Sequence, residues 1–340
     1  MYRKSLSAWV GFIVLAMGIQ SSYGQSTVGT SAAQFLKIGV GSRAMAMGGA
    51  YVALANDASA LYWNPAGVTS MRRIELIAAH TEWFAGISHQ FVGVTVPLGS
   101  DNVVGLSAIL LTAGAMEQTT IQAPDGNGVF FDVTDLAVGL TYGMQLTDKV
   151  SAGLTGKFIR QTGFNESAST FALDIGLLLN TGYRGLSIGM NFSNLGGELQ
   201  LDGPDLLTKA TGRLGTSSVG KLATESFPLP ISFRVGVAME AAGKSGGSFF
   251  QSDVNRVTLT LDGTHQNDSK ETVGFGVEYA WNDLVAIRGG YILNHDVATF
   301  SLGGGVMFNL ASGFDVSADY AYANLGLLEN VHRVGLSLRF

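Results

Sequence analysis

Several short patterns in this chain of 340 residues could perform chemistry. The segment Gly185–Gly189 (GLSIG) matches the G-x-S-x-G motif that presents a nucleophilic serine. That motif requires a strained turn from a strand into a helix, whereas this segment has the alternating hydrophobicity of a continuous strand. The segment Gly39–Gly41 lacks the third glycine of a dinucleotide-binding loop. We therefore expect no serine nucleophile and no nucleotide cofactor.

Metal-binding residues are also sparse. The chain has no cysteine, which excludes thiolate metal sites and disulfides. Asp125–Gly128 indicates a turn, because the later ligands of a calcium loop are missing. The five histidines fall near loops or strand ends without metal-ligand spacing: His80, His89, His265, His295 and His332. We expect no metal, no cofactor and no enzymatic activity.

The composition narrows the class of protein. Hydrophobic residues make up 46% and charged residues 14% of the chain, which excludes intrinsic disorder. A net charge of −6 without a basic tract argues against nucleic acid as a partner. After residue 25 no charge-free apolar run reaches the roughly 18 residues of a spanning helix.

The N-terminus has the pattern of an export signal. Arg3 and Lys4 precede the apolar run Ala8–Ile19, and small residues lie at Ser22 and Gly24. This order of charge, apolar run and small residues predicts a secretory signal peptide over residues 1–24.

From residue 73 the chain alternates between apolar and small or polar residues. In Thr272–Trp281, for example, Val, Phe, Val, Tyr and Trp alternate with Gly, Gly, Glu and Ala. Strands near 9–11 residues with this period are typical of transmembrane β-barrels, whose apolar side chains face lipid. We expect fourteen antiparallel strands, at residues 74–80, 88–98, 102–113, 133–146, 149–162, 169–180, 184–194, 231–241, 255–265, 271–281, 284–293, 298–309, 313–323 and 331–340.

The connections support this interpretation. Those after even-numbered strands are short, except residues 242–254, and the longest follow odd-numbered strands, at 114–132 and 195–230. Bacterial outer-membrane barrels have short periplasmic turns and longer external loops. The chain also has 46 glycines, about twice the usual share. Glycines such as Gly290 and Gly303 would allow a non-alternating segment, residues 25–72, to pack inside the barrel.

Part of that segment carries a family signature. The stretches Ala33–Ala53 (AQFLKIGVGSRAMAMGGAYVA) and Ala60–Gly67 (ALYWNPAG) resemble the PorV/PorQ-like outer-membrane proteins, which are similar to FadL-type long-chain fatty-acid transporters. The resemblance implies a 14-stranded barrel, residues 73–340, that encloses an N-terminal hatch, residues 25–72. It implies hatch positions at Arg43, Met47, Gly48, Gly49, Trp63, Asn64, Pro65 and Gly67. The terminal Phe340 resembles the signal read by the barrel-assembly machinery.

Charged residues on the polar face of the strands would lie in the lumen. We expect them to pair with each other or with the hatch, and a ligand path is the alternative. They are Lys157, Asp174, Arg234, Glu240, Asp262, Glu278, Arg288, Asp315, Asp319, Arg333 and Arg339. The aromatic residues Trp63, Trp83, Trp281, Tyr279, Tyr291, Tyr320 and Tyr322 suit the girdles at the two membrane interfaces.

Two functions remain open at this level. The resemblance to PorV implies a component of type IX secretion in the bacterial outer membrane, with secreted cargo and other secretion components as partners. Cargo would dock on apolar residues of the loop 195–230: Leu206, Leu207, Leu222, Phe227 and Leu229. The alternative is FadL-like transport of hydrophobic small molecules such as long-chain fatty acids. Outer-membrane lipid would surround the barrel in either case.

Overall fold

The computed structural model describes residues 29–211, 217–244, 248–295, 297, 300–310, 313–326 and 330–340. The predicted signal peptide therefore lies outside the described residues. The helical elements are η1 (Gln34–Lys37), α2 (Ser42–Ala46), α3 (Ala60–Trp63), η2 (Pro65–Ser70), η3 (Phe84–Gly86) and η4 (Pro204–Leu206). None of the helices in these ranges is long and apolar enough to cross a membrane.

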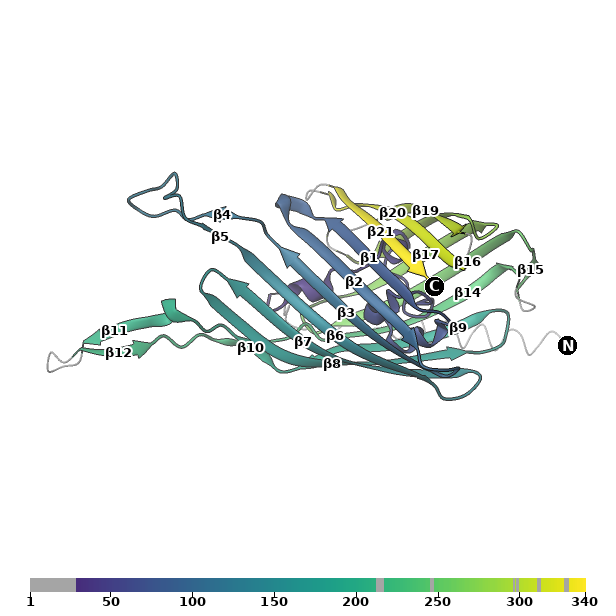
Figure 1. Cartoon of the computed structure of the whole chain (residues 1–340), viewed down its shortest axis with the longest axis horizontal. Coiled ribbons are helices and arrows are strands. Elements are labelled where there is room, and N and C mark those ends of the chain that lie inside the picture. Colours follow the sequence, from purple (N-terminus) through teal and green to yellow (C-terminus); the bar gives the residue numbers. More distant parts are fainter. Residues whose placement is uncertain are drawn as a thin grey trace, which may run out of the picture.

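Fourteen strands form a closed antiparallel barrel, as the alternation predicts (Figure 1). They are β1 (Glu75–Glu82), β2 (Ser88–Pro97), β3 (Asn102–Thr112), β6 (Val133–Gln145), β7 (Val150–Gly163), β8 (Glu166–Asn180), β9 (Leu186–Gly196), β14 (Ser232–Gly243), β16 (Asn255–Gln266), β17 (Ser269–Trp281), β18 (Val285–Leu293), β19 (Phe300–Leu310), β20 (Phe314–Asn324) and β21 (Asn330–Arg339). β1 pairs with β21, and β9 pairs with β14. The short β15 (Phe250–Gln251) adds to β14 outside the barrel.

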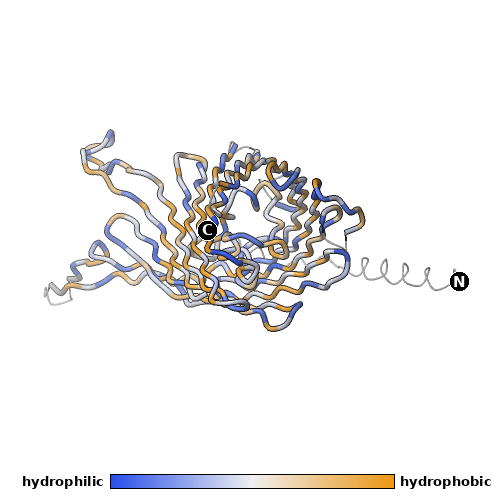
Figure 2. Tube along the Cα trace, turned by 45° about the vertical axis from the view of Figure 1, so that its right-hand side comes forward, coloured by the Kyte–Doolittle hydropathy of each residue, from blue (hydrophilic) through white to orange (hydrophobic). Residues whose placement is uncertain are grey.

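Side chains alternate between the two faces of the wall. In β17, Gly276, Glu278 and Ala280 are buried, whereas Val277 and Trp281 are exposed on the outer face. Figure 2 shows the same alternation of hydrophobic and hydrophilic residues along the strands. Large apolar side chains therefore coat the outside, and small or polar residues line the inside, as expected for a barrel surrounded by lipid.

Two of the long connections carry secondary structure of their own. Residues 113–132 contain the strand pair β4 (Met116–Glu117) and β5 (Phe130–Phe131). Residues 197–231 contain β10 (Glu198–Gln200) paired with β13 (Ser226–Pro228), and β11 (Leu207–Thr211) paired with β12 (Ser217–Lys221). Figure 1 shows β11 and β12 projecting well beyond the barrel wall. These ribbons lie at the end of the barrel remote from Phe340, which we call the loop end.

Residues 29–72, here called the luminal segment, lie inside the barrel and carry most of the buried apolar residues (Figure 1). They contain η1, α2, α3 and η2, and they supply buried side chains such as Phe35, Tyr51 and Trp63. This core is possible because the lumen side of the wall is lined by glycine. A Cβ on Gly290 would lie 2.0 Å from the backbone nitrogen of Gly48, and one on Gly153 would lie 2.2 Å from the carbonyl carbon of Pro65.

Candidate ligand site in the barrel lumen

The sequence Asn64-Pro65 fixes the middle of the luminal segment against the wall. Asn64 Oδ1 accepts a hydrogen bond from the Ala66 backbone N–H, which caps η2, and Pro65 occupies the first turn. Asn64 Nδ2 donates to the carbonyls of Val52 and of Leu177 in β8, at 2.8 and 3.1 Å. One asparagine therefore joins two parts of the segment to the barrel.

The glycine pair of the signature permits close approach to the opposite wall. Gly48 and Gly49 both have positive φ angles, 67° and 69°, which favour glycine. Gly48 N–H donates to Ser301 Oγ of β19 at 3.1 Å. The neighbouring Met47 is fully buried, and a Cβ added to Gly276 of β17 would lie 2.8 Å from the Met47 Cβ. Gly67 likewise has no room for a side chain, since a Cβ there would meet the Ala55 carbonyl.

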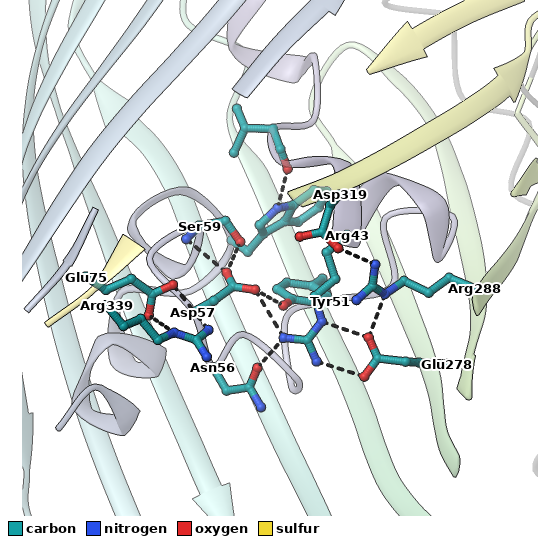
Figure 3. Close-up of polar contacts among 12 residues, drawn as sticks. Arg43, Tyr51, Asn56, Asp57, Ser59, Glu75, Glu278, Arg288, Asp319 and Arg339 are labelled. Carbon is teal, nitrogen blue, oxygen red and sulfur yellow. Dashed lines mark hydrogen bonds and ion pairs between the residues drawn. The ribbon is translucent and has the colours of Figure 1, made fainter. Parts of the chain in front are cut away.

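A chain of ion pairs anchors α2 to three strands (Figure 3). Arg43 Nε donates to Glu278 Oε2 at 2.8 Å, and Arg43 Nη1 contacts Asp57 Oδ2 at 3.2 Å. Arg288 Nε donates to the same Glu278 oxygen at 2.7 Å, and Arg288 Nη1 donates to Asp319 Oδ1 at 2.5 Å. Because these charges are largely buried, each depends on its partners to offset the cost of desolvation.

Asp57 is the acidic group that holds the luminal segment together. Its carboxylate accepts hydrogen bonds from the Tyr51 and Ser59 hydroxyls, both at 2.5 Å. Burial acts to raise the pKa of Asp57, but Arg43 and the bonds from Ser59 and Tyr51 outweigh it and hold the pKa below its usual value. Burial raises the pKa of Tyr51, with Asp57 adding to the shift. Asp57 is therefore ionised and Tyr51 neutral at pH 7.

Apart from Arg333, the remaining predicted lumen charges also have partners within the part of the chain that the structure describes. Lys157 Nζ lies 2.6 Å from Asp174 Oδ2 and donates to Asn194 Oδ1 at 2.8 Å. Asp315 pairs with Arg73, which precedes β1. Three others contact the segment or the wall as follows: Arg234 lies over the rings of Tyr62 and Trp63, Asp262 accepts from the Val52 backbone N–H, and Arg339 pairs with Glu75.

Two adjoining cavities lie at the loop end, between the luminal segment and the wall. Both are lined by Gln34, Lys37, Gly39 and Met45 of the segment. The larger, about 580 Å³, is the more polar of the two and includes Asp262, Asp268 and Thr264 among its lining residues. We call the smaller one, about 280 Å³, the apolar cavity. Its apolar lining consists of Ile38, Met45, Trp83, Phe84, Ile292, Val297, Phe300, Ala323 and Leu325.

The turn between β16 and β17 binds the part of the luminal segment that lines these cavities. Asp268 Oδ1 lies 3.0 Å from Lys37 Nζ, and Asp268 Oδ2 accepts from Gln34 Nε2 at 2.6 Å and from Ser31 Oγ. Burial acts to raise the pKa of Asp268, yet the bonds from Gln34, Ser31 and Lys37 hold it below its usual value. This carboxylate therefore fixes residues 31–37 at the loop end.

The loop residues proposed for docking divide into two groups. Leu207, Leu222 and Phe227 are exposed, and Leu206 is half-buried. The expectation for Leu229 is wrong, because its side chain is only 1% exposed and belongs to the core. The cause is that β13 returns the chain to the barrel rim, where Leu229 packs inward against the Gly196 region.

The terminal and girdle aromatics are placed as follows. Phe340 exchanges backbone hydrogen bonds with Ile74, and its ring lies 5.8 Å from that of Phe314. Trp281 is exposed on the outer wall. Trp63 is not a girdle residue: it is 4% exposed and its indole N–H donates to the Val40 carbonyl at 2.9 Å. Trp83 lines the apolar cavity.

Sequence reasoning missed Phe84, Asp57 and Asp268 as site residues. The bulky pair Trp83-Phe84 in a predicted turn was the available signal for the cavity. Asp57, two residues before Ser59, has the spacing of an Asx turn. The role of Asp268 depends on contacts across 231 residues or more, which no local pattern reveals.

A family model and several solved structures match this chain. The model of an uncharacterised protein family, UPF0164, matches residues 11–192, which is more than half of the chain. No curated protein matches.

The solved structures share the fold at low identity. The CymD monoaromatic hydrocarbon channel is 14% identical, with a TM-score of 0.58 over 89% of this chain and 97% of CymD. The toluene transporter TodX of Pseudomonas putida is 11% identical, with a TM-score of 0.56 over 88% and 97%. A FadL homologue of Pseudomonas aeruginosa is 13% identical, with a TM-score of 0.50 over 88% and 96%. At these identities the likeness concerns the fold alone.

Proposed function

We propose that this chain, which belongs to the uncharacterised protein family UPF0164, is an outer-membrane channel for small hydrophobic molecules. The observation that carries the proposal is the apolar cavity of about 280 Å³ between the luminal segment and the wall. A concave site lined by apolar and aromatic side chains is typical of small-molecule binding. Its place at the loop end would make it the first site met by a molecule that enters from outside.

The location follows from the same architecture. An apolar outer coat, an even number of strands and long connections at one end are typical of outer-membrane barrels. On this proposal the loop end is external, residues 1–24 direct export, and the surrounding lipid is that of the outer membrane. The barrel-assembly machinery would recognise the terminal strand that ends in Phe340.

The luminal segment would act as the hatch. It fills the lumen between the cavities and the end of the barrel where β1 begins, so a ligand could pass only if the segment shifts or if the wall offers a side exit. The similarity to a monoaromatic hydrocarbon channel and a toluene transporter supports transport over secretion.

Uptake by intact cells tests the proposal. Loss of the gene should slow accumulation of labelled toluene supplied at low concentration, and the wild-type gene should restore it. Ala323→Phe, which fills the apolar cavity, should fail to restore uptake. Ala318→Phe is the matched control, because it lies on the same strand with its side chain on the outer wall. Equal uptake with and without the gene would refute the proposal.

Secretion of type IX cargo is a second candidate, favoured by the projecting ribbons. Leu207, Leu222 and Phe227 expose apolar area at the loop end, which suits contact with a secreted protein or another secretion component. Removing residues 206–222 should then leave cargo in the periplasm while the barrel still folds. Unchanged cargo export by that deletion would refute this role.

A further inference from the structure

Arg333 of β21 is a buried cation that forms no ion pair with the residues that the structure describes. It is 2% exposed, and its Nε and Nη1 atoms have no hydrogen-bond partner among the described residues. Among the other predicted lumen cations, Lys157, Arg288 and Arg339 have acidic partners, and Arg234 lies over the rings of Tyr62 and Trp63. A buried charge that lacks a partner is costly, so Arg333 differs from the three lumen cations that form ion pairs.

Within the described ranges, the surroundings of Arg333 offer an aromatic contact but no carboxylate. Its guanidinium carbon lies 5.5 Å from the centre of the Trp83 ring, within the range of a cation–π contact. Thr81 faces both Arg333 on one neighbouring strand and His89 on the other. His89 is also buried, and its Nε2 has no partner in the described part of the chain. Two polar groups at one level of the wall are therefore left unsatisfied.

Arg333 also lines the apolar cavity. The described residues around that cavity include no aspartate or glutamate, and its second cation, Lys37, is already paired with Asp268. Two aromatic residues, Trp83 and Phe84, contribute to the same lining, whereas the ring of Phe300, a third lining residue, is 42% exposed and contacts Tyr322. The cavity thus combines a guanidinium that has no acidic partner among the described residues with an apolar lining that includes Trp83 and Phe84.

We propose that Arg333 binds the carboxylate of a monoaromatic carboxylic acid whose ring occupies the apolar cavity. This proposal rests on the proposed transport function and names its substrate class. A planar guanidinium matches a carboxylate in shape and charge, and the charge-assisted bonds would satisfy donors that are otherwise unpaired. A volume of about 280 Å³ suits a single substituted ring. A neutral hydrocarbon would fill the same space but leave the Arg333 guanidinium desolvated and without an anionic partner.

Three related ligands distinguish the contribution of the carboxylate to binding from the contribution of the apolar part. The probes are 4-isopropylbenzoate, its neutral counterpart isopropylbenzene, and palmitate, titrated into the purified full chain by calorimetry. We expect the wild type to bind the benzoate about tenfold or more tightly than the hydrocarbon, because a hydrogen bond to a charged group contributes more than a neutral contact.

Variants of Arg333 then test the residue. Arg333→Met should weaken benzoate binding by about tenfold or more and leave isopropylbenzene within about twofold. Arg333→Lys should retain part of the benzoate affinity. Arg160→Met, which removes an exposed arginine from β7, is the control and should change neither. Heat-modifiable mobility on gels reports folding, and Arg333→Gln replaces the Met variant if that variant does not fold.

The outcomes are distinguishable. If Arg333→Met binds the benzoate as tightly as the wild type, or if the wild type prefers the hydrocarbon, this inference is overturned while the transport proposal stands. If palmitate binds more tightly than the benzoate through Arg333, the aromatic part of the inference is overturned. If none of the three probes binds, both the inference and the transport proposal fail.

Discussion

Arg43 and Glu278 form a two-bond ion pair across 235 residues of sequence, with Nε–Oε2 and Nη2–Oε1 distances of 2.8 and 2.9 Å. Arg43 belongs to α2 of the luminal segment and Glu278 to β17 of the wall. Glu278 also accepts a hydrogen bond from Arg288 of β18. The pair therefore joins the segment to a charge network of the barrel, and its strength should decide how firmly the segment is held.

Replacing Glu278 by Gln should destabilise the protein by about 3–5 kcal/mol, because it leaves buried arginines without their anion. Denaturant unfolding in detergent measures the loss. Lys244→Met is the control, since the exposed Lys244–Asp283 pair should contribute no more than about 1 kcal/mol. An equally small effect of both changes would contradict the anchoring role of Glu278.

Adjacent glycines in β18 provide a second test. Gly290→Ala places a Cβ 2.0 Å from the Gly48 nitrogen, so the segment must move and stability should fall by about 1–3 kcal/mol. Gly289→Ala adds the same atom on the outer wall, where the nearest neighbour is Leu302 at 3.8 Å, and should change stability by less than about 0.5 kcal/mol. Limited proteolysis of residues 29–72 should show release in the first variant. Identical protection of the two variants would refute close packing at Gly48.

The contacts of Asp268 predict a dependence on pH. Because the pKa of Asp268 is lowered in the folded protein, its contribution is complete above the unfolded value near 4 and is lost as the pH falls through the folded pKa. The protection of residues 31–37 against hydrogen exchange, relative to the intrinsic rate at each pH, should therefore be retained at pH 5 and be lost only below about pH 4. Asp268→Asn should give fast exchange at neutral pH. Loss of this protection in the wild type between pH 7 and pH 5 would show that another group controls the segment.

The barrel could be predicted from sequence because each strand repeats one simple rule, apolar outward and small or polar inward. The glycines at 290 and 303 indicated that a segment approaches the inner wall, and the structure places Gly48 and Ala46 there. The alternation cannot reveal which residues meet inside the lumen. Their residue type alone therefore predicted that Trp63 and Trp83 belong to an aromatic girdle. In the structure Trp63 packs in the luminal core and Trp83 lines a cavity.

Leu229 illustrates the same limit. Its spacing among apolar residues of a long loop indicated a docking surface, but the strand pair β10–β13 returns it to the core. Asp57 and Asp268 could not be identified because their partners are distant in sequence or are backbone and hydroxyl groups that follow no periodic pattern. The positions of such residues depend on how the luminal segment folds against the wall.

Photoaffinity labelling tests the transport account most directly. The full chain in outer-membrane vesicles would be labelled with a small phenyl diazirine, with and without excess toluene, and the modified residues mapped by mass spectrometry. The account predicts toluene-protected labelling at Trp83, Phe84 and Leu325, which line the apolar cavity, and loss of that labelling in Ala323→Phe. Labelling confined to outward residues such as Phe275 and Leu302, with no protection by toluene, would contradict it.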